Sequence, residues 1–247
     1  ESPHIGICVS GGPDSVALLL LMKDWIKSQN GKITVFHFNH GIREESSREA
    51  LLIYSMVRKM GIECHVLSWK RSFKEKVNMK SARDIRYKMI LENCKKLKII
   101  HLMTGHHYDD NLETYFMRNK RRNCSLGLSG IPKSLITENV EIVRPLLSFS
   151  KERLIATCKF YKIKWLNDCN NQNNLYERPR VRKELSTKNK TEIKKISQQL
   201  ELSKKKNDEI EIKIKDFFYK NIKFYDNGVF ELNKERFLEA APQIQLE

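Results

Sequence analysis

Three short polar stretches of the chain carry the residue types with which proteins handle phosphates, metal ions and protons. The first stretch, SGGPDS, contains Ser10, Gly11, Gly12, Asp14 and Ser15. It follows an alternating apolar segment that predicts a buried strand, and it precedes an apolar pattern that predicts a helix. Backbone N–H groups at such a Gly-Gly turn can bind a phosphate, because no Cβ blocks the approach. Asp14 would repel a phosphate directly, so we expect it to hold a metal ion that bridges phosphates.

The second stretch places acidic side chains at the start of another predicted helix. It contains Asp109, Asp110 and Glu113, preceded by His106 and His107. Asp109 and Glu113 stand four residues apart and so share one face of a helix. Carboxylates beside a phosphate site can bind magnesium or an ammonium group, although acids also stabilise a helix N-terminus for dipole reasons alone. The two histidines could act as acid–base groups or contact phosphate.

The third stretch, His40 to Arg43, ends one of several strands that alternate with helices. Apolar alternation and capping residues predict strands at 32–39, 63–68, 98–104 and 140–143, and helices at 44–60, from 81, at 111–117 and at 150–161. This order indicates an α/β fold, a doubly wound, Rossmann-like parallel sheet. Ligands bind beyond the carboxyl ends of such strands, and all three polar stretches fall at those ends.

The later part of the chain predicts simpler features. The segment 177–183 has the composition of a basic loop, and the chain from Thr191 onward has that of a charged helix. Asp226-Asn227-Gly228 is a turn signal.

The charge of the chain is unusual. Lys and Arg number 46 against 30 Asp and Glu, which gives a net charge of +16. Such a surplus favours a polyanionic partner, although a lysine-rich genome would also produce it. The six cysteines include no C-x-x-C pair, which argues against a zinc ribbon and fits reduced cytoplasmic thiols. Because the longest apolar run is too short to span a bilayer, we expect a cytoplasmic protein with no membrane partner.

These motifs carry a resemblance at two levels. Ser-Gly-Gly-x-Asp-Ser after a strand is similar to the pyrophosphatase loop of enzymes that cleave ATP to AMP and pyrophosphate. The ordered set SGGPDS, HFNHGIR, NMKSARDIRY, TGHHYDDNLET, GLSGIP, VRPLLSFSKERL and WLNDCNN resembles the tRNA(Ile)-lysidine synthetase family. The match runs from about Ile5 to Leu185.

The resemblance implies a fold of the adenine nucleotide alpha hydrolase type and a ligase that forms a carbon–nitrogen bond. An enzyme of this family adenylates C2 of the wobble cytidine of tRNA(Ile) with the CAU anticodon. The amine of free L-lysine then displaces AMP and leaves lysidine. The implied cofactors are ATP and Mg²⁺, with Mg²⁺ held at Asp14 and Asp109.

The resemblance also assigns roles to individual residues. ATP would be bound by Ser10, Gly11, Gly12, Asp14, Ser15, His40 and Arg43. The catalytic residues would be Asp14, Asp109, Asp110 and Glu113. Contacts to substrate or tRNA would come from Arg83, Arg86, His106, His107, Arg144, Arg178, Arg180 and Arg182. A carboxylate can orient the ammonium group of lysine and accept a proton from the attacking amine.

Some segments depart from the family pattern. KRRNCS at 120–125 stands where a Gly-Ser-Gly stretch is common, NDCNN at 167–171 lacks the usual serine, and Pro179 replaces a frequent Asn. We expect an ATP-pyrophosphatase-type catalytic domain at 1–183. The helical, charged region at 184–247 would be a truncated extension that begins a second domain. A homo-oligomer is one possible state.

Other functions stay open at this point. A tRNA 2-thiolating enzyme with the same loop usually needs paired or cluster-binding cysteines, and the chain has no C-x-x-C. An amide ligase would need an ammonia supply, for which no glutaminase-like nucleophile is evident. A basic RNA-binding protein with an inactive nucleotide fold would have lost the loop glycines or Asp14, and all of these are present.

Overall fold

The computed structural model describes residues 2–39, 41, 45–69, 79–121, 128–166 and 177–239. The chain divides into two compact units. The first comprises Glu1–Asn111 with Ile131–Pro179, and the second comprises Leu112–Gly130 with Arg180–Glu247. The domain division expected at residue 183 stays a prediction.

The first unit is an α/β structure in which strands and helices alternate along the chain. Its elements are β1 (His4–Cys8), α1 (Pro13–Ser28), β2 (Lys32–Asn39), α2 (Glu45–Lys59), β3 (Glu63–Ser68), α3 (Met79–Lys96), β4 (His101–Met103), β5 (Ser134–Ile136), β6 (Glu141–Val143) and α5 (Lys151–Phe160). Two further helices, α4 (Tyr108–Lys120) and α6 (Glu177–Thr187), begin in this unit.

The sheet has the strand order β3-β2-β1-β4-β6-β5. Neighbouring strands are parallel except for β5, which pairs antiparallel with β6 at one edge. The order reverses between β1 and β4, and in open α/β sheets ligands bind at such a switch point. The predicted doubly wound sheet is therefore confirmed, while the short antiparallel edge strand β5 was not predicted.

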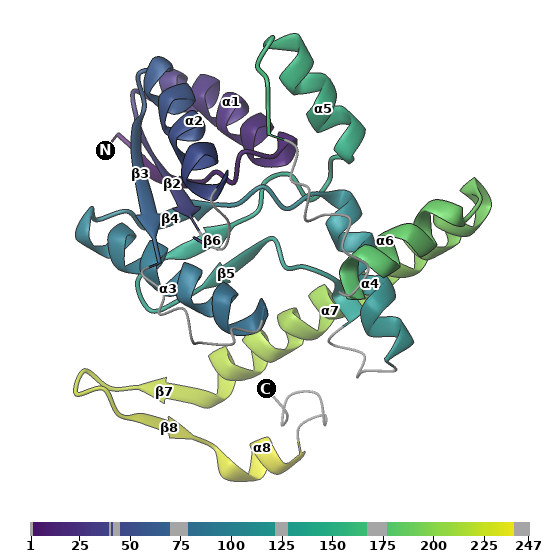
Figure 1. The fold of residues 1–247 in the computed structure, drawn as a ribbon. Coiled ribbons are helices and arrows are strands. Elements are labelled where there is room, and N and C mark those ends of the chain that lie inside the picture. Colours follow the sequence, from purple (N-terminus) through teal and green to yellow (C-terminus); the bar gives the residue numbers. More distant parts are fainter. Residues whose placement is uncertain are drawn as a thin grey trace. The chain divides into compact units, whose positions relative to one another are not determined.

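Helices cover both faces of the sheet (Figure 1). On one face, Leu18 of α1, Ile53 of α2 and Leu154 of α5 pack in a single core with strand residues such as Ile7. On the other face, Ile90 of α3 packs with strand and loop side chains in a second core. Parallel strands buried on both faces are expected to be apolar throughout, and β2 is buried from Ile33 to Asn39.

The second unit is mainly helical. Its elements include α7 (Lys190–Asn221), β7 (Ile222–Phe224), β8 (Phe230–Leu232) and α8 (Lys234–Glu239). Asn189 begins α7 with a capping box, in which its side chain accepts from Glu192 N and the Glu192 side chain accepts from Asn189 N. The turn predicted at Asp226-Asn227-Gly228 joins the antiparallel strands β7 and β8, so a hairpin interrupts the helix expected there.

One sequence prediction is wrong in this region. The segment 177–183, expected to be a basic loop, forms the first turns of α6. Val181 is its buried residue, and arginine is a good helix former. Pro179 is tolerated because the first helical turn needs no internal N–H donors.

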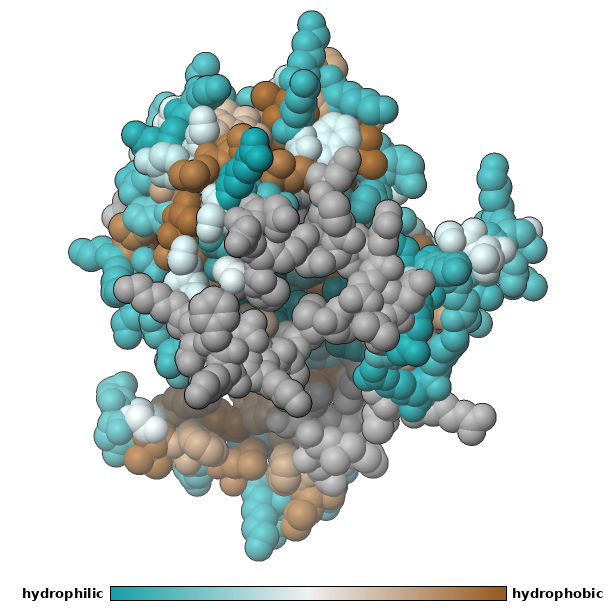
Figure 2. All heavy atoms as spheres, viewed as in Figure 1, coloured by the Kyte–Doolittle hydropathy of each residue, from teal (hydrophilic) through white to brown (hydrophobic). Residues whose placement is uncertain are grey.

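Some large apolar side chains remain on the surface of the first unit. Leu51 and Leu52 of α2 are 69% and 53% exposed, and Trp25 of α1 is 44% exposed. Figure 2 shows apolar surface over the region where Figure 1 places α1 and α2. No helix in the described part of the chain is long and apolar enough to cross a membrane.

Candidate active site

The SGGPDS loop joins β1 to α1 and is held in shape by a serine of its own. The Ser15 hydroxyl accepts hydrogen bonds from the backbone N atoms of Ser10 (3.1 Å) and Gly11 (3.2 Å), and it donates to Gly12 O at 3.0 Å. Gly12 is the N-cap of α1 and makes no side-chain cap. Because Gly12 has no side-chain oxygen to cap the helix, the first backbone N–H groups of α1 are suited to bind an anion.

Three glycines lie in or beside the SGGPDS loop, and the absence of a Cβ serves a different purpose at each of them. Gly11 has φ +95°, and a Cβ there would lie 2.7 Å from Ile53 Cδ1. A Cβ on Gly12 would meet only Ser10 Oγ within 4 Å, at 3.8 Å, so the described chain leaves space in front of it. A Cβ on Gly105 would lie 3.1 Å from Ser15 N and Asp14 C. Gly105 thus lets the segment after β4 approach the backbone of the loop.

The acidic start of α4 reaches the loop through a buried histidine. His107 Nε2 lies 3.6 Å from Asp14 Oδ2 and 3.5 Å from Asp110 Oδ2. Its Nδ1 lies 3.2 Å from Asp109 Oδ2, and its backbone N donates to Asp110 Oδ2 at 3.1 Å. The side chain of His107 is only 2% exposed. The structure thus brings together Asp14 and the two aspartates that the sequence placed at the same rim.

The carboxylates control the charge of this histidine. Burial lowers the pKa of His107, but Asp109, Asp14 and Asp110 outweigh it and raise the pKa to about 10. For Asp109, burial raises the pKa, and hydrogen bonds from His107 and from the backbone of Lys151 outweigh it and hold the pKa below its usual value.

One carboxylate oxygen in this cluster suits a metal ion. Asp14 Oδ1 is buried, and no described residue donates a hydrogen bond to it. Asp109 Oδ2 accepts from Lys151 N at 2.8 Å, and Lys151 Nζ lies 3.9 Å from Asp14 Oδ2. The described residues contain no group of three or more His, Cys, Asp or Glu that could hold a metal by itself. Mg²⁺ typically binds only one or two carboxylates and completes its shell with phosphates and water. Asp14 and Asp109 could supply these carboxylates.

The other histidine, His106, has the opposite electrostatics. Thr104 Oγ1 lies 2.9 Å from its Nδ1. Burial lowers its pKa, and although Asp110 raises it, Arg144, Arg83 and Arg178 lower it further, to about 4. The ring is therefore neutral at pH 7 and has arginines nearby.

These arginines form a cationic region of the first unit. Arg144 is only 6% exposed and donates from Nη1 to Pro132 O at 2.9 Å. Its buried Nε has no hydrogen-bond partner among the described residues. The guanidinium carbons of Arg83 and Arg86 lie 5.2 Å and 5.4 Å from the ring centroid of Tyr87. Guanidinium groups held in this way are suited to bind phosphates or carboxylates.

The remaining predicted contacts lie on α6. Arg178 Nη2 is 3.7 Å from Asp110 Oδ1 in the first unit. In the second unit, Arg182 Nε donates to Glu113 Oε1 at 2.7 Å. Arg180 is exposed. Alternate residues of a helix point in different directions, so the three arginines do not form one row.

Two of the predicted ATP contacts, His40 and Arg43, lie outside the described residues. So do most of KRRNCS at 120–125 and all of NDCNN at 167–171. Their roles stay predictions.

Sequence reasoning missed three residues that shape the site. Thr104 orients His106, and Lys151 contacts both Asp109 and Asp14. The buried Asn111 accepts from Ile131 N at 2.6 Å and so ties α4 to the chain that returns toward β5. Lys151 could have been found, because it follows the predicted cap Ser150 and the first N–H groups of a helix seek acceptors.

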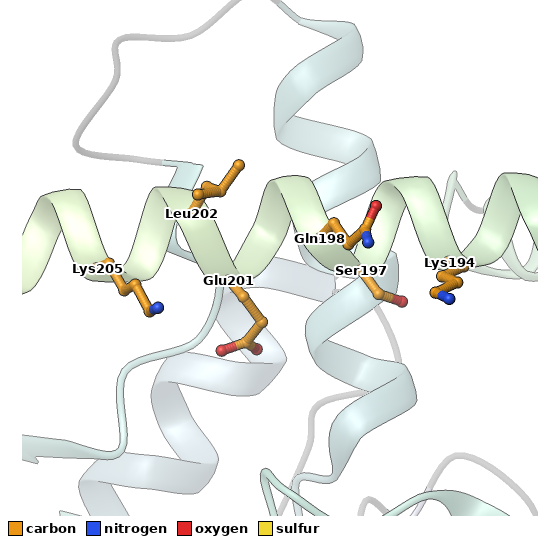
Figure 3. Close-up of a pocket in the computed structure, with 6 residues that line it drawn as sticks. All are labelled: Lys194, Ser197, Gln198, Glu201, Leu202 and Lys205. Atoms are coloured by element: carbon orange, nitrogen blue, oxygen red, sulfur yellow. The ribbon is translucent and has the colours of Figure 1, made fainter.

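A separate hollow of about 460 Å³ lies on the second unit. It is lined by Lys194, Ser197, Gln198, Glu201, Leu202 and Lys205, all on α7 (Figure 3). These side chains offer no set of groups for catalysis, and we assign no chemistry to this hollow.

Residues 1–189 match the family model described as the PP-loop domain. The chain belongs to the PP-loop family. Membership implies the use of ATP, which fits the loop at Ser10–Ser15 and the acid in the first turn of α1. The pyrophosphatase loop and the fold expected from the sequence are thus confirmed.

Two curated relatives of this PP-loop chain carry the same name. It is 32% identical over 254 residues to tRNA(Ile)-lysidine synthase of Orientia tsutsugamushi, a match that covers 98% of this chain and 57% of the relative. It is 34% identical over 193 residues to the protein of that name from Wolbachia pipientis wMel, covering 77% of this chain and 44% of the relative. The chain therefore spans about half the length of the curated relatives it matches.

A solved structure of another protein shares the fold. The U34-tRNA thiolase NcsA from Methanococcus maripaludis is 18% identical, with a TM-score of 0.66 over 81% of this chain and 71% of that chain. At this identity the likeness shows the architecture alone.

Proposed function

We propose that the protein joins free L-lysine to C2 of the wobble cytidine in tRNA(Ile) with the CAU anticodon, through an adenylated tRNA intermediate. The observation that carries this proposal is the cluster in which Asp14 of the PP loop meets the acidic start of α4 around His107. One cluster then serves a phosphate reaction and an amine reaction. The relatives named tRNA(Ile)-lysidine synthase supply the substrate classes.

The reaction has two balanced steps. In the first, the O2 atom of cytosine attacks the α-phosphorus of ATP and pyrophosphate leaves. In the second, the amine nitrogen of lysine attacks C2, the C2–O2 bond breaks, and AMP leaves with O2 while the amine loses a proton. Adenylation is needed because C2 is a weak electrophile and its oxygen is otherwise a poor leaving group.

The chain's own residues act mainly on charge in the first step. Backbone N–H groups at the start of α1 can hold the phosphates of ATP, and Gly12 leaves room for their approach. Arg83, Arg86 and Arg144 can bind phosphate oxygens of ATP or tRNA. Asp14, with Asp109, would hold Mg²⁺, which would neutralise charge that develops on the phosphates.

In the second step the carboxylates act on the amine. Free lysine brings an ammonium group that must be oriented and must lose a proton before it can attack. Asp109, Asp110 or Glu113 can accept hydrogen bonds from that ammonium and help to remove the proton. Each of these acids already has a basic partner, His107, Arg178 or Arg182, so the amine would have to share or replace it.

The rival 2-thiolation function would use cysteine chemistry. The described cysteines Cys8, Cys64, Cys94 and Cys158 are all free thiols. Burial raises their pKa values, to about 12 for Cys8 and Cys94 and about 11 for Cys64 and Cys158. Thiols of this kind are poor nucleophiles and metal ligands at neutral pH, so these four residues do not favour thiolation.

We further propose that the protein works in the cytoplasm, where ATP, lysine and tRNA occur together.

We also propose that the protein self-associates, which the exposed Leu51 and Leu52 of α2 support. Light scattering of the wild-type chain and of a Leu51→Ser, Leu52→Ser variant tests this proposal. If the two proteins had the same molar mass at every concentration, this surface would not mediate self-association.

The decisive experiment is mass analysis of nucleosides from an unmodified tRNA(Ile) transcript with a CAU anticodon after incubation with ATP and lysine. We expect a mass increase that corresponds to lysidine, and none when lysine or ATP is omitted or when the wobble base is uridine. Asp14→Asn should abolish the product while the fold remains cooperative. A cytidine of unchanged mass in the complete reaction would refute the proposed function.

A further inference from the structure

His107 is the residue through which the PP loop contacts the acidic start of α4. Its ring lies between Asp14, on the loop, and Asp109 and Asp110, on the helix. We propose that His107 is a positioning residue, whose Nε2 side fixes the carboxylate of Asp14 relative to Asp110 so that the loop is set for adenylation. This inference rests on the proposed function, and it replaces the tRNA contact that the sequence predicted for His107.

The burial of His107 supports an internal role. Only 2% of the side chain is exposed, so a polynucleotide would have little of the ring to touch. All the described polar contacts of the ring are to groups of the site: three carboxylates, and the backbone N of Asp109, which lies 3.2 Å from Nδ1. Buried polar groups in general have at least one hydrogen-bond partner, whereas this ring faces three carboxylates at once.

The two nitrogens of the His107 ring contact different parts of the site. On the Nδ1 side, the ring meets Asp109 of its own helix start. On the Nε2 side, it meets Asp14 at 3.6 Å and Asp110 at 3.5 Å, which come from segments far apart in the sequence. The Nε2 side therefore joins the loop to the helix, whereas the Nδ1 side is local.

Asp14 has few other groups to hold it. Lys151 Nζ lies 3.9 Å from Oδ2, while Oδ1 has no partner among the described residues. Carboxylates that face one another repel in a partly buried site unless a donor stands between them. Without the ring, Asp14 and Asp110 should move apart, and Asp14 Oδ1 should lose its fixed direction.

The two amide side chains allow a matched test. In His107→Gln the amide nitrogen can lie where Nε2 lies, and in His107→Asn it can lie where Nδ1 lies. We expect the Gln variant to keep most of the adenylation rate, within about 10-fold of the wild type. The Asn variant should lose about 10- to 150-fold, the value of a lost charge-assisted hydrogen bond. The measurement is pyrophosphate release from ATP and tRNA in the absence of lysine.

A buried histidine elsewhere in the first unit serves as the control. His37 is 6% exposed, and its Nδ1 lies 2.8 Å from Val9 O, so it has a backbone partner in place of carboxylates. His37→Gln should lower the melting temperature but leave the rate of the folded fraction and its dependence on Mg²⁺ unchanged. The proposal is wrong if the Gln and Asn variants of His107 lose equal activity. It is also wrong if the unfolded fraction alone accounts for the activity that each variant loses, as we expect for His37→Gln.

A binding measurement separates this proposal from the proposed function. Calorimetry with Mg²⁺ and a non-hydrolysable ATP analogue should show weaker binding for His107→Asn than for His107→Gln. That result would support the positioning role even if the wild type formed no lysidine. Equal binding by both variants, with lysidine formed normally by the wild type, would overturn the positioning role and leave the function standing.

Discussion

Arg182 donates to Glu113 through two nitrogens, Nε to Oε1 at 2.7 Å and Nη2 to Oε2 at 3.3 Å. Glu113 is almost fully buried, with its side chain 4% exposed, while the Arg182 side chain is 40% exposed. A two-point contact of this kind fixes both side chains. Arg182 therefore pairs with Glu113, an acid of its own unit. Arg178 lies near another acid, Asp110.

Among the arginines of α6, we consequently expect the exposed Arg180 to contact tRNA without also pairing with a nearby acid of the chain. Arg180→Gln should weaken tRNA binding and lower the slope of log affinity against log salt by about one unit, the effect of one lost phosphate contact. Its melting temperature should stay unchanged. Filter binding across a salt series provides the measurement.

Lys27→Gln removes the same charge from the last turn of α1, at the end of the helix that is remote from the PP loop, and should leave the slope as it is. If Arg180→Gln and Lys27→Gln behaved alike, the positive charge of the chain would be compositional.

Adjacent glycines of the PP loop should respond differently to alanine. Gly11→Ala places a Cβ at φ +95° against Ile53 and should cost about 1–3 kcal/mol of stability. Gly12→Ala meets only Ser10 Oγ at 3.8 Å and should leave stability within about 0.5 kcal/mol. We nevertheless expect Gly12→Ala to weaken ATP binding, because its Cβ would occupy the space in front of the helix start. Urea denaturation and calorimetry measure the two effects, and tight ATP binding by Gly12→Ala would place the phosphates elsewhere.

The sheet and its rim could be predicted because local patterns determine them. Apolar alternation marked β1 and β2, and the polar stretches at strand ends followed from the geometry of parallel sheets. The helix α6 was misjudged, since Pro179 and the arginines suggested a loop whereas the buried Val181 anchors a helix. The role of His107 depends on Asp14, which is distant in sequence, and no local pattern reveals such a pairing.

Partners of the acids were hidden for the same reason. Asp109, Asp110 and Glu113 look alike in the sequence, as one cluster of open carboxylates. In the structure, Lys151 and His107 contact Asp109, and Arg182 contacts Glu113. These partners come from segments that only the folded chain brings near, so residue types were predictable but their pairing was not.

The neighbouring histidines should give stability opposite dependences on pH. The pKa of His106 is lowered to about 4, so the unfolded chain binds a proton between pH 6.5 and 4 that the folded chain does not. Stability should therefore fall as the pH falls through this window, by up to about 1.4 kcal/mol per unit. The pKa of His107 is raised to about 10, so its contribution is complete below pH 6.5 and is lost as the pH rises toward 10.

Denaturation by urea at a series of pH values measures both effects. His106→Gln should flatten the slope between pH 4 and 6.5 and leave the alkaline side unchanged. His107→Gln should flatten the slope above pH 6.5, and it should also alter the acid side, because Asp109 loses a hydrogen bond that lowers its pKa. The lowered pKa of His106 would be contradicted if His106→Gln changed the slope above pH 6.5, and the raised pKa of His107 would be contradicted if His107→Gln left that slope unchanged.

The acids at the start of α4 should separate the two steps of the reaction. Asp109 and Asp110 share His107 with Asp14, so Asp109→Asn and Asp110→Asn should slow adenylation as well as lysine transfer. Glu113 instead pairs with Arg182. We therefore expect Glu113→Gln to make the adenylated tRNA nearly normally and to pass it to lysine about 10- to 150-fold more slowly, as for one lost charge-assisted hydrogen bond.

Single-turnover trapping of the intermediate followed by a lysine chase distinguishes the two steps. Glu184→Gln is the matched control, because Glu184 pairs with Lys120 at 2.6 Å in the same unit but is 40% exposed. It should transfer lysine at the wild-type rate. If each of the three acid variants either blocked adenylation or transferred lysine normally, these carboxylates would serve metal binding or the helix start, and the amine of lysine would be recognised by other residues.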